Sequence, residues 1–158
     1  MTETTLPRLT KRLDTATRVD AVAALTLEQR VRSRQRIRLD DGREAGLLLP
    51  RGETLKDGDL VTTDDHSLTV RIIAAPECVS IAVCDNALLL ARACYHLGNR
   101  HVALQIEPGR LCWLHDHVLD AMVTGLGLEV TVQHAPFEPE PGAYGGHASG
   151  HGHAHHAH

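Results

Sequence analysis

Three consecutive segments in the second half of the chain are Cys78-Val-Ser-Ile-Ala-Val-Cys84, Asp85-Asn86 and Ala87-Leu-Leu-Leu-Ala-Arg-Ala-Cys-Tyr-His-Leu97. The first segment is short and apolar, which favours a buried strand. Asp85-Asn86 is typical of a helix N-cap, and the third segment has the length and apolar content of a helix that Gly98-Asn99 ends. The stretch therefore predicts a strand followed directly by a helix.

The residues after this helix extend the alternation of strands and helices. We expect a strand at His101–Ile106, a strand at Arg110–Leu114, a helix from His115 or Asp116 to about Leu126, and a strand at Glu129–Gln133. Together with the first strand and helix, these elements give the order βαββαβ. That order is typical of the split, ferredoxin-like arrangement.

The first half of the chain has the pattern of short strands. The segment Arg30-Val-Arg-Ser-Arg-Gln-Arg-Ile-Arg-Leu39 has Arg at every even position from 30 to 38, and this period of two predicts a strand with one arginine face. Asp41-Gly42 has hairpin-turn chemistry, with Glu44–Leu49 as the return strand. Further strands are expected near Leu60–Thr62 and Leu68–Ala74. Short strands at close turn spacing indicate a small antiparallel β domain.

Charge divides the chain unevenly. Residues 1–75 hold 13 Lys and Arg against 12 Asp and Glu, whereas residues 76–158 hold 3 against 8. The shift falls at the turn-like pair Ala75-Pro76, which we take as a boundary. We therefore expect an α+β protein with a β domain at 1–75, a ferredoxin-like domain at 76–137, and a Pro/Glu linker and His-rich tail at 138–158. Such a tail cannot form a core and is expected to be disordered without metal.

The composition argues against several classes of function. Only four residues are aromatic and the formal net charge is −4, which together argue against a nucleic-acid-binding protein. No apolar run reaches the roughly 20 residues of a membrane helix, and the N-terminus lacks the apolar region of a secretory signal. We therefore expect a cytoplasmic protein without membrane contact. The sequence has no P-loop, GxGxxG, GxSxG or HExxH motif, so we do not expect an enzyme.

Histidine is the unusual residue type, with 12 in the chain and six of them in the last twelve residues. Neutral imidazole suits nickel, zinc, copper and cobalt, and a loose tract can wrap an ion with several ligands at once. The candidate ligands in the tail are His147, His151, His153, His155, His156 and His158. A purification tag is the alternative explanation, but Gly and Ala interrupt this tract, unlike a plain hexahistidine.

A second group of candidates is the pair His96 and His101. His96 lies at the end of the first expected helix and His101 opens the following strand, with Gly98-Asn99 making the reversal between them. The two imidazoles can therefore meet at one metal ion. Because two ligands leave a site incomplete, a second copy of the chain across a two-fold axis is the natural completion. The alternative is that both are ordinary surface histidines.

The third group is His115-Asp-His117, at an expected junction of strand and helix. In a regular element these two histidines point apart, but at a junction they can converge on one ion. The alternatives are two solvated turn histidines, or a hydrolase site with a third ligand and a carboxylate base. Asp116 is the only close carboxylate in the sequence, so the hydrolase interpretation is poorly supported.

The arginine face of residues 30–38 also has two interpretations. Five cations on one strand can grip phosphates, as an RNA-binding surface does. Alternatively, the strand is a solvent-facing edge whose charges prevent aggregation and pair with Asp40, Asp41 or Glu44. We favour the edge strand, and prefer an acidic protein over RNA as its partner.

Several of these segments occur together in one known family. They are Ala93-Cys-Tyr-His-Leu-Gly-Asn-Arg-His101, Gln105, His115-Asp-His-Val-Leu-Asp120, Pro136-Phe-Glu-Pro-Glu140 followed by Gly-Ala-Tyr144, and the His-rich tail. In the first half, Leu39-Asp-Asp-Gly-Arg-Glu-Ala-Gly-Leu47 and Leu49-Pro-Arg-Gly52 extend the match. With these features the chain resembles the UreE family of urease accessory proteins over nearly its whole length.

The resemblance implies a nickel metallochaperone that forms a homodimer through its ferredoxin-like domain, with an N-terminal domain often called peptide-binding. It implies His101 of both subunits as the principal ligands of one interfacial nickel ion, and His96, His115 and His117 as auxiliary positions. Zinc or copper can bind the same ligands. The implied partners are the urease accessory GTPase (UreG) and the apo-urease activation complex. The residues alone leave open a nickel or zinc storage protein that acts through its tail.

Overall fold

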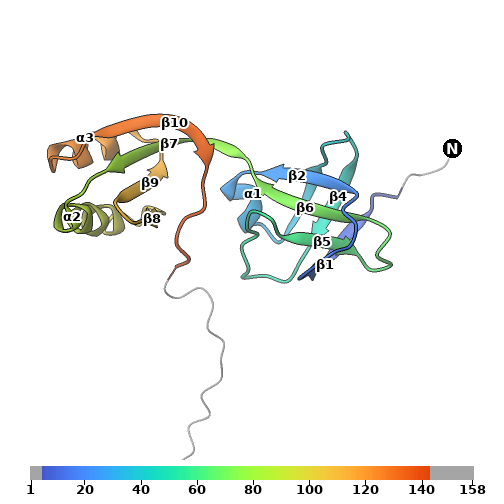
Figure 1. Cartoon of the computed structure of the whole chain (residues 1–158). Helices are drawn as coiled ribbons and strands as arrows, with labels where there is room; N and C mark the ends of the chain where they lie inside the picture. Colours follow the sequence, from blue (N-terminus) through green and yellow to red (C-terminus); the bar gives the residue numbers. More distant parts are fainter. Residues whose placement is uncertain (1–4, 143–158) are drawn as a thin grey trace, which may run out of the picture.

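The structure, a computed structural model, describes residues 5–142, so the expected His-rich tail lies outside the described residues. These residues form two sheets, one from each half of the chain (Figure 1). The elements of the first half are β1 (Arg8–Leu13), β2 (Ala21–Leu25), α1 (Leu27–Val31), β3 (Arg34–Arg38), β4 (Glu44–Leu48), β5 (Leu60–Thr63) and β6 (Thr69–Ala74). Within residues 5–142, no helix has the length and apolar character needed to cross a membrane.

The first sheet has the strand order β2-β6-β5-β1-β4-β3. Its two edge strands approach each other where the backbone N–H of Asp40 donates to the Val22 carbonyl at 2.8 Å, so the sheet curves into a near-barrel. Aliphatic side chains such as Leu9, Leu47 and Ile72 fill the interior. The sheet is not purely antiparallel as expected, because β1 pairs with β4, and β2 with β6, in parallel. β1 and β2 were not anticipated from the sequence.

The expected arginine strand is wrong over its first part. Thr26 begins helix α1 with a capping box, in which its hydroxyl accepts from the Gln29 backbone while the Gln29 side chain accepts from the Thr26 N–H. This local signal places Arg30 on a helix, where its side chain is buried. Strand β3 begins only at Arg34, so the arginine face consists of Arg34, Arg36 and Arg38.

The second sheet confirms the βαββαβ order. Its elements are β7 (Pro76–Val83), α2 (Ala87–Gly98), β8 (Gln105–Glu107), β9 (Arg110–Leu114), α3 (His117–Gly125) and β10 (Val130–Pro136). The strand order β10-β7-β9-β8, with antiparallel neighbours, matches the ferredoxin-like arrangement. One face of this sheet packs on both helices through a core that includes Trp113, Leu97 and Val123.

The pair Ala75-Pro76 is not a turn. Strand β6 ends at Ala74 and β7 begins at Pro76, so the chain passes between the two sheets nearly straight (Figure 1). The N–H of Ala75 donates to the Leu25 carbonyl at 2.9 Å, which holds this passage against the end of β2. The residue before a proline prefers an extended conformation, and this fits a continuing strand as well as a turn.

Residues 137–140 are held by contacts with both halves of the chain. Phe137 is fully buried and, with Leu27 of α1, covers the second face of the β7–β9 sheet. The buried guanidinium of Arg30 donates to three carbonyl oxygens, those of Leu25, Leu55 and Phe137. Glu138 lies 3.9 Å from Arg30, and its carboxylate accepts from the N–H of Asp57 at 2.7 Å. The polar sequence of this segment did not predict that it is fixed in place.

Replacing Arg30 by Met is expected to lower the free energy of unfolding by about 3 kcal/mol, because three buried carbonyls lose their donor. The midpoint of urea unfolding measures the effect. Arg32→Met, which removes an exposed guanidinium two residues away, is the matched control and should change the midpoint little. Equal midpoints for the two variants would show that the buried contacts of Arg30 do not hold the segment.

Candidate metal centre

His101 lies in the turn that follows helix α2, not at the start of a strand as expected. Its φ is +57°, in the left-handed region, and its N–H donates to the Gly98 carbonyl at 2.9 Å. The N–H of Val102 donates to the Leu97 carbonyl, so His101 lies within the hydrogen-bonded turn that ends the helix. Strand β8 starts only at Gln105. The imidazole is therefore carried on an exposed reversal whose backbone the helix end defines.

His96 lies in the last turn of the same helix, as expected, and is half-buried. Its ring meets the ring of Tyr95 edge-to-face, with centroids 5.3 Å apart. The Arg100 guanidinium donates to the His96 carbonyl at 3.0 Å and ties the turn to the helix. Both His96 and His101 thus stand at the C-terminal end of α2, where the helix dipole favours cations.

His115 is held by two polar groups, the buried Ser80 hydroxyl and the partly buried Asp120 carboxylate. Its Nδ1 lies 3.0 Å from the Asp120 carboxylate and 3.0 Å from the Ser80 hydroxyl. The Trp113 indole N–H donates to the other oxygen of Asp120 at 3.0 Å. Because a carboxylate only accepts, Nδ1 carries the proton of the neutral ring and Nε2 keeps a free lone pair. This is the orientation that a carboxylate gives to a metal-binding histidine.

His117 is the first residue of α3 and is exposed. Asp116, the residue between the two histidines, is the N-cap of this helix and accepts from the N–H groups of Val118 and Leu119. Both hydrogen bonds lower the pKa of Asp116 below its ordinary value, and the one from the Leu119 N–H contributes most. Asp116 is thus occupied in capping, whereas Asp120 is the carboxylate that contacts His115.

Within residues 5–142, no three His, Cys, Asp or Glu side chains gather in a cluster that would hold a metal ion. His96 and His101 lie at the C-terminal end of α2. His115 and His117 lie where β9 leads into α3, so the four histidines form two separate pairs. The six tail histidines lie outside the described residues. Burial raises the pKa of the Cys94 and Cys112 thiols, which keeps them protonated and makes them poor ligands.

The polar groups around His115 were missed by sequence reasoning. Asp120 falls five residues after His115, and α3 brings it back to the end of β9. Ser80 comes from the neighbouring strand β7, where it pairs in register with Trp113. The sequence did offer a signal for Asp120, which is a carboxylate in the first turn of an expected helix close to a histidine. The contact from Ser80 had no such signal, because it depends on the register of β7 with β9.

Comparison with known proteins covers both halves of the chain. A family described as "UreE urease accessory protein, N-terminal domain" matches residues 3–75, and one described as "UreE urease accessory protein, C-terminal domain" matches residues 77–158. The chain is 58% identical over 136 residues to the urease accessory protein UreE of Enterobacter sp. (strain 638), covering 86% of this chain and 90% of the relative.

Two further relatives have the same description. The urease accessory protein UreE of Citrobacter koseri is 54% identical over 147 residues, covering 93% of this chain and 97% of the relative. That of Alkalilimnicola ehrlichii is 58% identical over 138 residues, covering 87% and 84%. Family matches to both halves, with relatives of this identity over nearly full length, show that the chain belongs to the UreE family of urease accessory proteins.

Proposed function

We propose that the protein is a nickel carrier that binds Ni²⁺ between two copies of its C-terminal half and delivers it during urease maturation. Membership of the UreE family of accessory proteins, which are not enzymes, supports the biological role. The observation that supports this site is the position of His101. It lies on an exposed turn with a left-handed conformation, and hydrogen bonds to the end of α2 fix the backbone of that turn. Imidazole is a good ligand for nickel, and also for copper and zinc.

The need for a second copy follows from the number of ligands. One chain offers His101, with His96 as the nearest candidate in sequence, and this is too few donors for a tightly held ion. Exposed apolar side chains supply a surface for self-association, since Leu88 and Tyr95 of α2 are 60% and 66% exposed. They are seven residues apart and so lie on one side of the helix. A two-fold axis beside His101 would bring two equivalent imidazoles to one ion.

The auxiliary role of His115 and His117 rests on the carboxylate behind His115. A histidine whose Nδ1 is held by Asp120 presents Nε2 to solvent in a fixed orientation, at little entropic cost on binding. The six tail histidines add further imidazole ligands that raise the number of ions bound. In this proposal they collect metal, and the interfacial ion is the one that is passed on.

The proposed partners are the urease accessory GTPase and the apo-urease activation complex. A site completed by two imidazoles leaves coordination positions that a recipient's ligands can take.

We also propose the division into a β domain at 1–75, a ferredoxin-like domain at 76–137 and a tail at 138–158. Separate sheets built from residues 8–74 and 76–136 support the first boundary. The contacts of Phe137 and Glu138 with Arg30, and of Glu140 with Leu104, favour moving the second boundary to about 140.

His101→Ala is expected to remove the tight nickel site without unfolding the protein, because the side chain is exposed. Titration calorimetry with Ni²⁺ should lose its highest-affinity step, with affinity falling at least about tenfold. His66→Ala is the matched control, since His66 is also exposed and also has a left-handed φ, of +58°. A tight step that persists in His101→Ala, or is lost in both variants, would contradict the assignment.

Removing the chain after Ala143 is expected to reduce the number of nickel ions bound and to leave the tight step in place. The reason is that His101, and with it the turn that carries it, remains in the shortened chain. Metal content after equilibrium dialysis gives the stoichiometry of the full and shortened chains. Loss of all nickel binding on truncation would instead indicate a storage protein that acts through its tail.

Asp120→Asn is expected to weaken a second, lower-affinity nickel step about tenfold, since an Asn whose carbonyl oxygen accepts from Trp113 turns its NH2 group, which only donates, toward His115 Nδ1. Asn can still accept from the Trp113 indole, so the fold should persist. The step is measured by competition with a chromogenic chelator on the shortened chain. Glu129→Gln, at an exposed position before β10, is the control. An unchanged second step would exclude His115 as an auxiliary ligand.

A further inference from the structure

Two residues outside the proposed nickel site place a thiol and an imidazole side by side. Cys78 of β7 and His134 of β10 are partners in the register of the second sheet. That register runs without a shift along the whole of β10, so no bulge disturbs the pair. Both side chains are exposed. Sequence reasoning did not find this pair, because the two residues lie far apart along the chain.

The hydrogen bonds of β7 show that Cys78 and His134 form the closer of the two kinds of cross-strand pair. The Cys78 carbonyl accepts from the His115 N–H at 3.0 Å, on the side of β7 that faces β9. The N–H and the carbonyl of one strand residue point to the same side, so toward β10 Cys78 belongs to a non-hydrogen-bonded pair. In such a pair the Cα atoms are about 4.5 Å apart and the side chains approach each other closely.

The pair lies on the face of the second sheet that packs on the helices, but beyond their cover. Ser80, two residues after Cys78, is on the same face, and its register partner Trp113 lies in the core with both helices. Ser80 and Trp113 are buried whereas Cys78 and His134 are exposed. Figure 1 shows β7 and β10 running on from the helices toward the first sheet. A metal ion can therefore reach the pair from solvent.

Cys78 differs from the other three cysteines of the chain. Burial raises the pKa of the Cys94 and Cys112 thiols, which disfavours the thiolate. Cys84 is partly buried, lies beyond the last register pair of β7 with β10, and its sulfur accepts from the N–H of Asn86 at 3.3 Å. Cys78 is thus the cysteine that combines an exposed thiol with an imidazole directly opposite.

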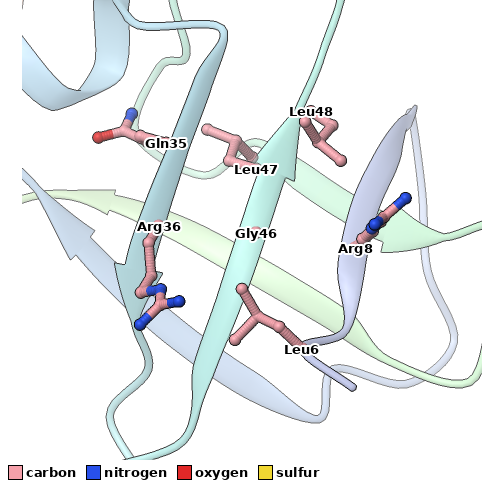
Figure 2. A pocket seen from close by; sticks show the side chains of 7 residues that line it. All are labelled: Leu6, Arg8, Gln35, Arg36, Gly46, Leu47 and Leu48. Atoms are coloured by element: carbon pink, nitrogen blue, oxygen red, sulfur yellow. The ribbon is translucent and has the colours of Figure 1, made fainter.

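The groove on the first sheet offers no comparable donors (Figure 2). It measures about 370 Å³ and has Arg8 and Arg36 on its two sides, with leucines, Gln35 and Gly46 as the remaining lining. A guanidinium has no lone pair to give to a metal ion, and its positive charge repels a cation. The thiol and imidazole on the second sheet have the opposite character, since both offer lone pairs.

The kind and number of these donors select the metal. Thiolate favours Cu(I) and zinc, and imidazole suits copper, zinc and nickel. Among residues 5–142 no third His, Cys, Asp or Glu joins a thiol and imidazole in a metal-binding cluster. Structural zinc almost always takes four ligands. The cuprous ion has a filled d shell and is stable with two ligands in a line, so two donors fit Cu(I) better than zinc or nickel.

We propose that Cys78 and His134 bind one Cu(I) ion between strands β7 and β10. The thiol proton passes to solvent as the copper–sulfur bond forms, the imidazole gives a nitrogen lone pair, and no electron is transferred. With bonds of the lengths that zinc makes, about 2.3 Å to sulfur and about 2.0 Å to nitrogen, one ion bridges about 4 Å between these atoms. That span suits a close cross-strand pair. The site uses neither His101 nor the tail and is independent of the nickel proposal.

The test is competition for copper between the full chain and the Cu(I) chelator bicinchoninate, without oxygen and with ascorbate to keep copper reduced. We expect Cys78→Ser and His134→Gln each to lower the affinity of the tightest Cu(I) step at least about tenfold. The ultraviolet thiolate-to-copper absorption, which histidines cannot produce, should appear with the first copper ion in the wild type and be absent from Cys78→Ser. Wild-type affinity in either variant would overturn the proposal.

Two control variants locate the binding. Cys84→Ser removes a thiol that lies beyond the register pairs with β10, and His66→Gln removes an exposed imidazole of the first half. Both should bind Cu(I) as the wild type does, and circular dichroism verifies that every variant is folded. Loss of the ultraviolet absorption in Cys84→Ser equal to that in Cys78→Ser would overturn the assignment to this pair.

Zinc and nickel separate the other possible occupants. Titration of the wild type and Cys78→Ser with Zn²⁺ and with Ni²⁺ should give the same tight steps for both proteins, because the pair supplies too few ligands for either ion. A zinc or nickel step that weakens about tenfold in both Cys78→Ser and His134→Gln, with Cu(I) binding unchanged, would overturn the assignment to copper.

Discussion

The buried guanidinium of Arg30 is the interaction on which the arrangement of the two halves depends. It lies on a five-residue helix, is 1% exposed, and donates to carbonyls at the end of β2, in the loop before β5 and just after β10. A buried charge is stable only when its donors are matched, so all three segments have to be in place at once. Arg30 thereby joins the first and last parts of the described chain.

This contact also helps to fix where residues 137–140 run. The N–H of Glu138 donates to the Gln105 side chain at 3.0 Å, and that of Glu140 to the Leu104 carbonyl at 2.7 Å. Leu104 and Gln105 follow His101 by three and four residues. The segment that leads into the His-rich tail is therefore attached beside the loop that leaves the proposed nickel turn. The chain therefore enters the His-rich tail from a segment near the proposed nickel turn, as a carrier that collects and then delivers an ion would require.

The proposed site also explains how binding and release can coexist. A nickel ion held by two equivalent imidazoles is anchored, but its remaining positions are open to water or to a recipient's ligands. The left-handed conformation at His101 is a modest local cost for a non-glycine residue, and the helix termination around it maintains that conformation. The position of the imidazole thus depends on the backbone of α2 and needs no deep pocket.

The sequence predicted the second half of the fold better than the first. In the second half, strands and helices alternate and each helix has its own cap, Asn86 or Asp116, so local signals and tertiary structure agree. In the first half, the arginine alternation begins inside a capped helix, and β1 and β2 are short strands whose pairing is set by distant partners. The repetition of arginine at every second position could not distinguish Arg30, which lies on a helix, from Arg36, which lies on a strand.

The candidate site shows the same division between local and long-range information. The histidines were found because residue type and spacing are visible in the sequence. The left-handed turn at His101 was mistaken for a strand, because the hydrogen bonds that define it come from the preceding helix. The Ser80 and Asp120 contacts to His115 require the register of β7 with β9 and the start of α3, which only the assembled sheet supplies.

Native mass spectrometry of the chain shortened after Ala143, with nickel added below one ion per chain, tests the central claim most directly. The masses distinguish two chains with one nickel from one chain with one nickel. The account predicts that the first metal-bound species to appear is two chains with a single ion, and that a mixed dimer of wild type and His101→Ala holds it less well. A single chain that binds one nickel as tightly as the dimer would contradict a site shared by two His101 side chains.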